Sequence, residues 1–193
     1  GAFSAAFVPL FNRRMAEDES MGTSQRFANE TLAVLLPALL VFSAVMMLVM
    51  PWVIWLIDDF GAGGRTNATS ISLARITFPY LGLISVMTLF GAILNSLSRF
   101  AAAAFAPTLM NLCMISAMLI GIWLGESDDP QAVASLLALS VVLAGILQVS
   151  WLWFWVRKAG FRFAFARPKL TTGVRELGVL ILPAVFGAGI YQI

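Results

Sequence analysis

Few side chains in this sequence could carry covalent or metal chemistry. Its 193 residues include no histidine and one cysteine, Cys113. A His/Cys metal site, a histidine proton relay, a catalytic His dyad and an intramolecular disulfide all need residues that are absent, so these sites are excluded. The net charge of +2 is too small to indicate a nucleic-acid partner. We therefore predict no catalytic residue, no metal ligand, no cofactor and no nucleic-acid partner.

The chemistry that remains belongs to amide and hydroxyl groups in apolar surroundings. Hydrophobic residues make up 60% of the chain and charged residues 11%, with a mean hydropathy of +0.90. Such a chain cannot cover a water-exposed surface and belongs in a bilayer. Asn and Gln at membrane depth usually bond to a neighbouring helix, so we favour packing over substrate contact for these residues. The polar residues in the apolar stretches are Thr77, Ser85, Thr88, Asn95, Asn111, Ser116, Gln148 and Gln192.

The elements that must position these groups are membrane-spanning helices. Residues 31–57, 76–98, 100–125 and 130–156 contain no charged residue, and each stretch exceeds the roughly 20 residues that cross the hydrocarbon core. Residues 1–11 and 177–193 are also apolar, and we expect them to be truncated spans of a longer protein. The fold class predicted is an all-α, polytopic membrane helix bundle with four complete transmembrane helices and two truncated ones. No Asp or Glu lies inside the four uncharged stretches, so none offers a proton-carrying carboxylate in the membrane.

The basic residues fix a topology. Ten of the twelve Lys and Arg residues fall on one side when successive spans alternate in direction, and the positive-inside rule places that side in the cytoplasm. The other side carries acidic residues. The basic side holds Arg13, Arg14, Arg26, Arg99, Arg157, Lys158, Arg162, Arg167, Lys169 and Arg175.

Three further patterns carry structural expectations. Prolines at 37, 51, 79, 107 and 183 should break or kink helices unless neighbouring groups bond the freed carbonyls. Glycines at 82, 91, 121 and 145 should permit close approach of helices. In the segment 161–169, phenylalanines alternate with Arg162, which predicts an interfacial stretch with its rings among the lipid headgroups.

Several motifs together resemble one family. The motifs are Gly1-Ala2-Phe3-Ser4-Ala5-Ala6-Phe7-Val8-Pro9-Leu10, Arg75-Ile76-Thr77-Phe78-Pro79-Tyr80, Gly91-Ala92-Ile93-Leu94-Asn95 with Arg99-Phe100, Ala106-Pro107-Thr108-Leu109-Met110-Asn111, and Leu182-Pro183-Ala184 with Gly187 and Gln192. They recur in order over nearly the whole chain and resemble the MurJ (MviN) lipid II flippases of the multidrug/oligosaccharidyl-lipid/polysaccharide exporter superfamily.

The resemblance implies a part of the N-terminal lobe of a transporter. Family members move lipid II, the undecaprenyl-pyrophosphate-linked peptidoglycan precursor, from the inner to the outer leaflet of the bacterial cytoplasmic membrane by alternating access. A membrane potential or ion gradient is the implied driving force. The implied partners are lipid II, membrane lipids and the remaining helices of the same polypeptide. Because the family's cavity arginines lie outside this chain, the piece alone is expected to be inactive.

The resemblance also assigns residues. Those that could line the substrate path are Gly1, Ala2, Phe3, Ser4, Pro183, Gly187 and Gln192. Those that match family motifs but are expected to serve helix packing and turn formation are Pro79, Asn95, Arg99, Pro107 and Asn111.

Other functions remain open at this point. Another exporter of the same superfamily could move drugs or lipid-linked polysaccharide, although a proton-coupled drug exporter would be favoured by a carboxylate in the membrane. A non-transport membrane scaffold would lack a charged cavity upstream of Gly1. A membrane enzyme lacks any nucleophile and base pair in this sequence.

Overall fold

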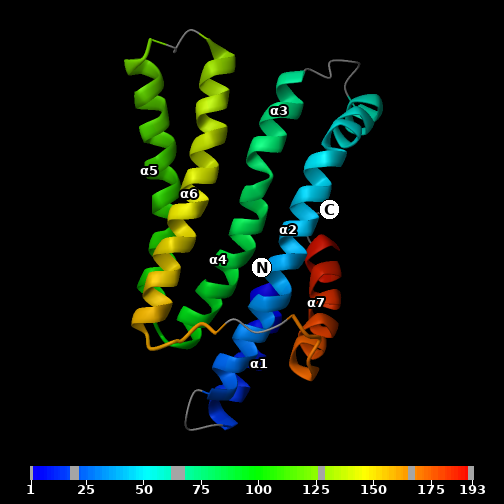
Figure 1. The fold of residues 1–193 in the computed structure, drawn as a ribbon, viewed down its shortest axis with the longest axis vertical. Helices are drawn as coiled ribbons and strands as arrows, with labels where there is room; N and C mark the ends of the chain where they lie inside the picture. Colours follow the sequence, from blue (N-terminus) through cyan, green and yellow to red (C-terminus); the bar gives the residue numbers. More distant parts are fainter. Residues whose placement is uncertain (1, 18–21, 62–67, 126–128, 165–167, 191–193) are drawn as a thin grey trace. The chain divides into compact units, whose positions relative to one another are not determined.

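Every element of regular structure in the described part of the chain is an α-helix. The computed structural model describes residues 2–17, 22–61, 68–125, 129–164 and 168–190 (Figure 1). This confirms the predicted all-α class. The helices are α1 (Ala2–Glu17), α2 (Gly22–Gly61), α3 (Ala68–Thr77), α4 (Pro79–Ser96), α5 (Phe100–Trp123), α6 (Pro130–Lys158) and α7 (Thr172–Ile190).

Four segments are long and apolar enough to cross a membrane, as expected. They are Gly22–Leu56, Ile71–Ser96, Phe100–Trp123 and Pro130–Lys158. The second comprises most of α3 and all of α4, which are separated only by a turn at Phe78. Pro79 explains the interruption, because its ring has no N–H to bond the carbonyl of Arg75 and clashes with that carbonyl in a continuous helix.

The other prolines lie inside continuous helices, so the expected break occurs at Pro79 alone among the five. Pro37 and Pro51 are within α2, Pro107 within α5 and Pro183 within α7. At Pro51 the freed carbonyl belongs to Met47, four residues earlier. The Nε atom of Arg75 donates a hydrogen bond of 3.0 Å to that oxygen. A neighbouring helix thus supplies the donor that the proline removes, which is the exception that the sequence analysis allowed for a proline inside a membrane helix.

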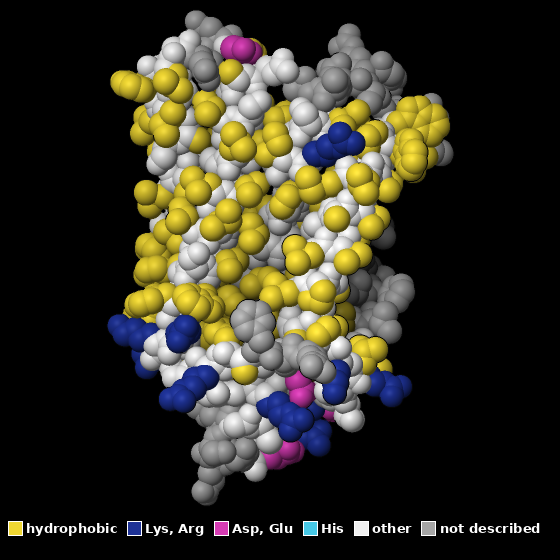
Figure 2. Space-filling view, in the orientation of Figure 1, with side chains coloured by type: hydrophobic (Ala, Val, Ile, Leu, Met, Phe, Trp, Pro, Cys, Tyr) yellow, Lys and Arg dark blue, Asp and Glu magenta, His cyan; other side chains and the backbone are white. Residues whose placement is uncertain are grey.

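The chain forms two compact units. Unit 1 consists of Gly1–Ala38, Ser85–Ala104 and Ser150–Ile193, and unit 2 consists of Leu39–Ile84 and Phe105–Val149. Among the described residues, every Lys and Arg except Arg75 belongs to unit 1. In Figure 2 most of the dark blue Lys and Arg side chains gather on unit 1, and hydrophobic side chains spread over the visible face of unit 2.

The surface of unit 2 is apolar to a degree that suits lipid rather than water. Leu40, Leu48 and Trp123 are 69%, 76% and 85% exposed. Burying large side chains of this kind is favourable, so a soluble unit would not leave so many outside. The acyl chains of a bilayer can cover them at no such cost.

Small residues bring helices of unit 2 together at two of the four predicted positions. A Cβ atom added at Gly145 of α6 would lie 2.7 Å from Tyr80 Cδ2 and 2.8 Å from Leu83 Cδ1, so only glycine fits there. A Cβ atom at Gly121 would meet Leu136 Cδ1 at 3.3 Å. Gly82 has ordinary contact distances around it, and no atom lies within 4 Å of a Cβ at Gly91. The expectation of close approach is wrong for Gly91.

A buried amide also joins α5 to α6. Gln148 is 2% exposed, and its Nε2 atom donates a hydrogen bond of 2.9 Å to the carbonyl of Ala106. This is the helix-to-helix packing bond that the sequence predicts for Gln148. Asn111, which the sequence grouped with it, is exposed on α5.

The turn between α4 and α5 is only three residues long. Arg99 N–H donates to Leu94 C=O at 2.8 Å and Ser98 N–H donates to Asn95 C=O at 3.1 Å, while Ser98 has a φ of 56°. These two bonds and the left-handed residue are the Schellman arrangement that ends a helix, in which glycine is the usual residue at the left-handed position. Gly160 ends α6 in the same way, with a φ of 90°.

The core of unit 1 is aromatic. Rings of Phe3, Phe7 and Phe11 stack along α1 at centroid distances of 5.6 and 5.5 Å, and Phe7 stacks on Phe27 of α2 at 5.3 Å. Phe11 contacts Phe161. Aromatic pairs at such distances add stabilisation beyond the area that they bury.

The predicted interfacial placement of the phenylalanines after α6 is wrong. Phe161 is 1% exposed, and Phe163 contacts both Phe161 and Phe90. The rings of Phe161 and Phe163 contact each other and pack against the helices of unit 1 instead of lying among the lipid headgroups. Phe165 lies outside the described residues.

Candidate functional site at the junction of α1, α2 and α7

The residues predicted to line a substrate path lie on α1 and α7, two helices that pack against each other. Ala2, Phe3 and Ser4 form the start of α1, and Pro183 and Gly187 lie within α7. Gly1 and Gln192 are outside the described residues. The placement brings the two predicted groups onto neighbouring helices, and their role in a path stays a prediction.

The residues that match family motifs lie at turns and helix surfaces. Pro79 begins α4, while Asn95 and Arg99 flank the Schellman turn with exposed side chains. Pro107 and Asn111 lie in α5, also exposed. The Asn95 carbonyl accepts a turn hydrogen bond from Ser98 N–H, and its side chain forms no hydrogen bond with the described residues.

The structure adds a set of polar residues, of which the sequence analysis used only the arginines, as markers of topology. We call it the polar junction and define it by six residues of α1, α2, the α6–α7 linker and α7. They are Arg13, Arg14, Arg26, Glu30, Thr171 and Glu176.

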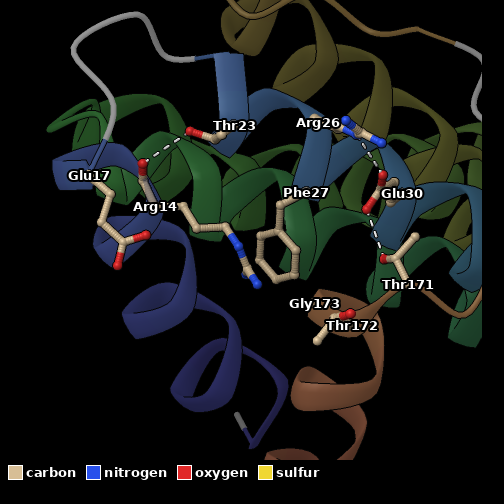
Figure 3. Close-up of a pocket in the computed structure, with 9 residues that line it drawn as sticks. All are labelled: Arg14, Glu17, Thr23, Arg26, Phe27, Glu30, Thr171, Thr172 and Gly173. Carbon is tan, nitrogen blue, oxygen red and sulfur yellow. Dashed lines mark hydrogen bonds and ion pairs between the residues drawn. The ribbon is translucent and has the colours of Figure 1, made fainter.

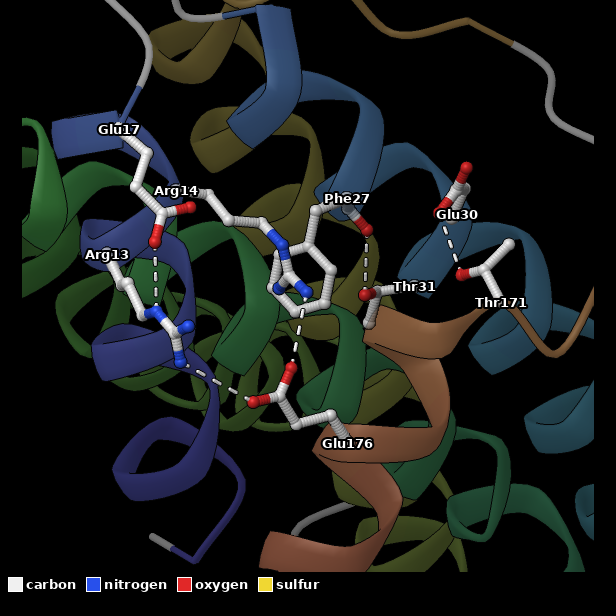
Figure 4. Close-up of polar contacts among 8 residues, drawn as sticks. All are labelled: Arg13, Arg14, Glu17, Phe27, Glu30, Thr31, Thr171 and Glu176. Atoms are coloured by element: carbon white, nitrogen blue, oxygen red, sulfur yellow. Dashed lines mark hydrogen bonds and ion pairs between the residues drawn. The ribbon is translucent and has the colours of Figure 1, made fainter.

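Arg14 is the most enclosed cation of the polar junction. Its side chain is 22% exposed, and its Cζ atom lies 4.0 Å from the centre of the Phe27 ring, a cation–π distance (Figure 4). Its Nη2 atom is 3.4 Å from Glu176 Oε2. Its Nη1 atom is buried and has no hydrogen-bond partner in the described structure. Glu176 therefore provides most of the compensation for this charge.

The first turn of α7 fits closely against Arg14. A Cβ atom added at Gly173 would lie 2.7 Å from Arg14 Nη2 and 3.1 Å from Phe27 Cδ2. A larger residue at this position would displace the guanidinium and press on the Phe27 ring. Glu176, one turn further along α7, then reaches the same guanidinium.

Glu30 of α2 connects this helix to the start of α7. Its Oε1 atom accepts a hydrogen bond of 2.9 Å from Arg26 Nε, and its Oε2 atom accepts one of 2.8 Å from Thr171 Oγ1, the residue just before α7 (Figure 3). A carboxylate beside a helix N-terminus is favourable because unpaired N–H groups give that end a partial positive charge. Glu30 therefore holds the start of α7 against α2.

Arg13 lies on the outside of the polar junction. Its Nε atom is 3.0 Å from Glu17 Oε1 and its Nη1 atom 3.8 Å from Glu176 Oε1. The hydrogen bond with Glu17, and then the negative charges of Glu17 and Glu176, raise the pKa of Arg13 above its ordinary value. A guanidinium is charged at any physiological pH, so this shift creates no switch.

Two cavities flank the polar junction, both within unit 1. One, of about 550 Å³, is lined by both Arg14 and Arg26 and by both Glu17 and Glu30, so its charges balance. The other, of about 560 Å³, lies between α2 and the α6–α7 linker. Figure 3 shows the first cavity with the Arg14 guanidinium beside Phe27 and the threonines at the start of α7.

A signal for the polar junction does exist in the sequence. Arg13 and Glu17 are four residues apart, as are Arg26 and Glu30, a spacing that pairs side chains on a helix. The spacing indicates helices that continue beyond the apolar stretches. Nothing in a single sequence pairs Arg14 with Glu176, which are 162 positions apart.

The four apolar spans, the lipid-suited surface of unit 2 and the charged end of unit 1 define the class as a polytopic helical membrane protein. Among the described residues no group of His, Cys, Asp and Glu could hold a metal ion. The sequence model of the family described as "Lipid II flippase MurJ" matches residues 1–193. The chain therefore belongs to the MurJ family, whose members are transporters rather than enzymes.

Individual relatives agree with this assignment. The chain is similar to the "Probable lipid II flippase MurJ" proteins of Rhizobium meliloti and Rhizobium tropici, with 37% and 38% identity over 195 residues. It is 34% identical over 204 residues to the protein of the same description from Vibrio cholerae. Each alignment covers 100% of this chain, which spans 36% or 37% of the length of these relatives.

Proposed function

We propose that the whole protein moves lipid II from the inner to the outer leaflet of a bacterial cytoplasmic membrane. The observation that carries the proposal is the match of the MurJ family model to residues 1–193. The structure supports it with four membrane-crossing segments and with the packing of α1 against α7, the two helices that hold the predicted path residues. The residues described here would contribute part of a path.

The chemistry of the substrate sets what the whole protein must do. Lipid II carries a pyrophosphate and a polar disaccharide-peptide, which hydrocarbon does not dissolve, so the protein has to offer a polar route while the polyprenyl tail stays in lipid. Without an Asp or Glu in the four uncharged stretches, this part of the protein provides no proton carrier. We infer that a membrane potential or another ion gradient drives the movement.

The proposal includes an orientation. The loops rich in Lys and Arg face the cytoplasm, by the positive-inside rule. The test is labelling by a membrane-impermeant thiol reagent in a Cys113→Ala background, with a single cysteine in place of Lys158 or of Asp129. Labelling of the Asp129 variant in intact cells, and of the Lys158 variant only after lysis, supports the orientation. The opposite result contradicts it.

The experiment for the transport activity is a depletion and rescue test. The gene for the whole protein is expressed in a bacterium depleted of its own lipid II flippase, and lipid II accessible at the outer leaflet is measured. Restored exposure that is lost when an ionophore collapses the membrane potential, with ATP maintained, supports both the substrate and the driving force. Normal expression without exposure of lipid II contradicts the substrate, and another lipid-linked sugar exported by the same superfamily becomes the alternative.

A further inference from the structure

The second cavity of unit 1 is built from one helix face and one linker. Its residues on α2 are position 22 and the adjacent pairs 25/26 and 29/30, and the steps of three and four between them place all five on a single face of the helix. The opposite wall is formed by four described residues that lie between α6 and α7 in the sequence. The cavity measures about 560 Å³, and its residues are Gly22, Gln25, Arg26, Asn29 and Glu30 of α2 with Arg162, Ala164, Lys169 and Thr171 of the linker.

Positive charge prevails in this cavity. It is lined by Arg26, Arg162 and Lys169 against one carboxylate, Glu30. Both oxygens of Glu30 already accept hydrogen bonds, one from Arg26 and one from Thr171. Arg162 and Lys169 are exposed and form no ion pair in the described part of the chain. Two cations therefore face the cavity without a counter-ion from the described residues.

Neutral side chains fix the linker in place. Asn29 Nδ2 donates a hydrogen bond of 3.1 Å to the Arg162 carbonyl, and Gln25 Nε2 donates one of 3.4 Å to the Gly160 carbonyl. Asn29 is 7% exposed, and its Oδ1 atom is buried without a hydrogen-bond partner. The cavity thus combines two cations that form no ion pair with a linker that α2 holds in place.

The cavity lies where a membrane segment ends. The uncharged stretch of α2 begins at Thr31, directly after Glu30, and the span Gly22–Leu56 includes the whole helical wall of the cavity. Lipid phosphates occupy this level of a bilayer, and basic pockets between membrane helices bind anionic lipid headgroups. We propose that this cavity binds the phosphate-bearing headgroup of an anionic phospholipid, with Arg162 and Lys169 as its principal cations. The proposal is independent of what the protein transports.

Native mass spectrometry of the whole protein in detergent tests the proposal. Dissociation constants are measured for phosphatidylglycerol and phosphatidylcholine, with inorganic phosphate as a competitor. The variant is Arg162→Gln with Lys169→Gln. The matched control is Arg157→Gln with Lys158→Gln, which removes the same charge from cations that lie over Trp153 and Trp155 and not in the cavity. The thermal midpoint of each variant checks that it is folded.

We expect tighter binding of phosphatidylglycerol than of phosphatidylcholine. The cavity variant should weaken phosphatidylglycerol binding roughly thirty-fold, the effect of two headgroup-level charges. The control variant should change phosphatidylglycerol binding less than about three-fold, because Arg157 and Lys158 do not line the cavity and charges exposed to solvent are screened by salt. Equal weakening by both variants would overturn the proposal in favour of diffuse attraction. Displacement by equimolar inorganic phosphate would overturn it in favour of a free-anion site, and equal binding of both lipids would also overturn it.

Discussion

Unit 1 and unit 2 hold their helices together by different physical means. All ion pairs found among the described residues belong to unit 1, as does the stacked set of phenylalanines. Unit 2 relies on glycine contacts and on side chains that bond to backbone carbonyls, such as Gln148 to Ala106 and Arg75 to Met47. Unit 1 also has contacts of these two kinds, at Gly173 and Asn29, but among the described residues unit 2 has no ion pair to add to them.

The difference follows from the medium that each set of contacts suits. Where hydrocarbon surrounds helices, apolar side chains gain nothing by leaving lipid, so close backbone approach and internal hydrogen bonds provide the association. Where headgroups and water reach the protein, burial of aromatic rings and pairing of charges become useful. The contacts of unit 2 therefore suit hydrocarbon, and the rings and ion pairs of unit 1 suit headgroups and water.

The largest effect should come from filling the closest contact of unit 2. Gly145→Ala would place a methyl group within 3 Å of Tyr80 and Leu83 side-chain atoms, and we expect a loss of about 2 kcal/mol of unfolding free energy. Reversible unfolding in sodium dodecyl sulfate measures it. Gly91→Ala is the control, since its Cβ would meet open space and should leave stability unchanged or improved. Equal losses of unfolding free energy at both glycines would contradict the close packing at Gly145.

The next effect concerns the carbonyl freed by Pro51. Arg75→Gln removes the charged group that donates to the Met47 carbonyl, and we expect it to lower the free energy of unfolding by about 1.5 kcal/mol. In a Pro51→Ala background the new N–H can bond Met47, so the same substitution should cost less than half as much. A double-mutant cycle in the same unfolding assay gives the comparison. An unchanged cost in the alanine background would show that Arg75 acts elsewhere.

A smaller effect is expected in unit 1. Glu176→Gln removes the charge that compensates Arg14, and partial exposure of both side chains limits the cost to about 1 kcal/mol. Arg14→Met keeps an apolar contact with Phe27 and removes the guanidinium. In that background Glu176→Gln should cost less than half as much, because only the longer and more exposed contact with Arg13 is left to lose. The thermal midpoints of the parent, the two single variants and the double variant measure the coupling. Additive losses would argue against the pair.

The smallest effect should come from the buried amide of unit 2. Gln148→Met removes one hydrogen bond to α5, and such bonds between membrane helices average about 0.6 kcal/mol. Asn111→Leu is the comparison, because that amide is exposed and we expect no loss when it is replaced. The sodium dodecyl sulfate assay described for Gly145 measures the free energy of unfolding of both variants. A loss at Asn111 equal to that at Gln148 would contradict the distinction.

The sequence predicts the fold class and the four spans because the cost of placing charge in hydrocarbon leaves long uncharged stretches. It also predicts that Gln148 bonds across helices, since unpaired polar groups are costly in lipid. For Pro51 it leaves two outcomes open, a broken helix or a bonded carbonyl, and the structure has the second. It does not predict the polar junction, because Arg14 and Glu176 meet only through the tertiary packing of α1 and α7. It misplaces Phe161, because alternation defines two sides of a segment without saying which one is buried.

The backbone conformation at Ser98 limits which residues can replace it, even though its side chain is exposed. Because its φ is 56°, position 98 favours residues that accept left-handed backbone. A saturation scan should find glycine beneficial by about 1 kcal/mol, asparagine and aspartate well accepted, and valine and isoleucine selected against. The exposed side chain itself is dispensable, so the restriction on its identity comes from the backbone alone.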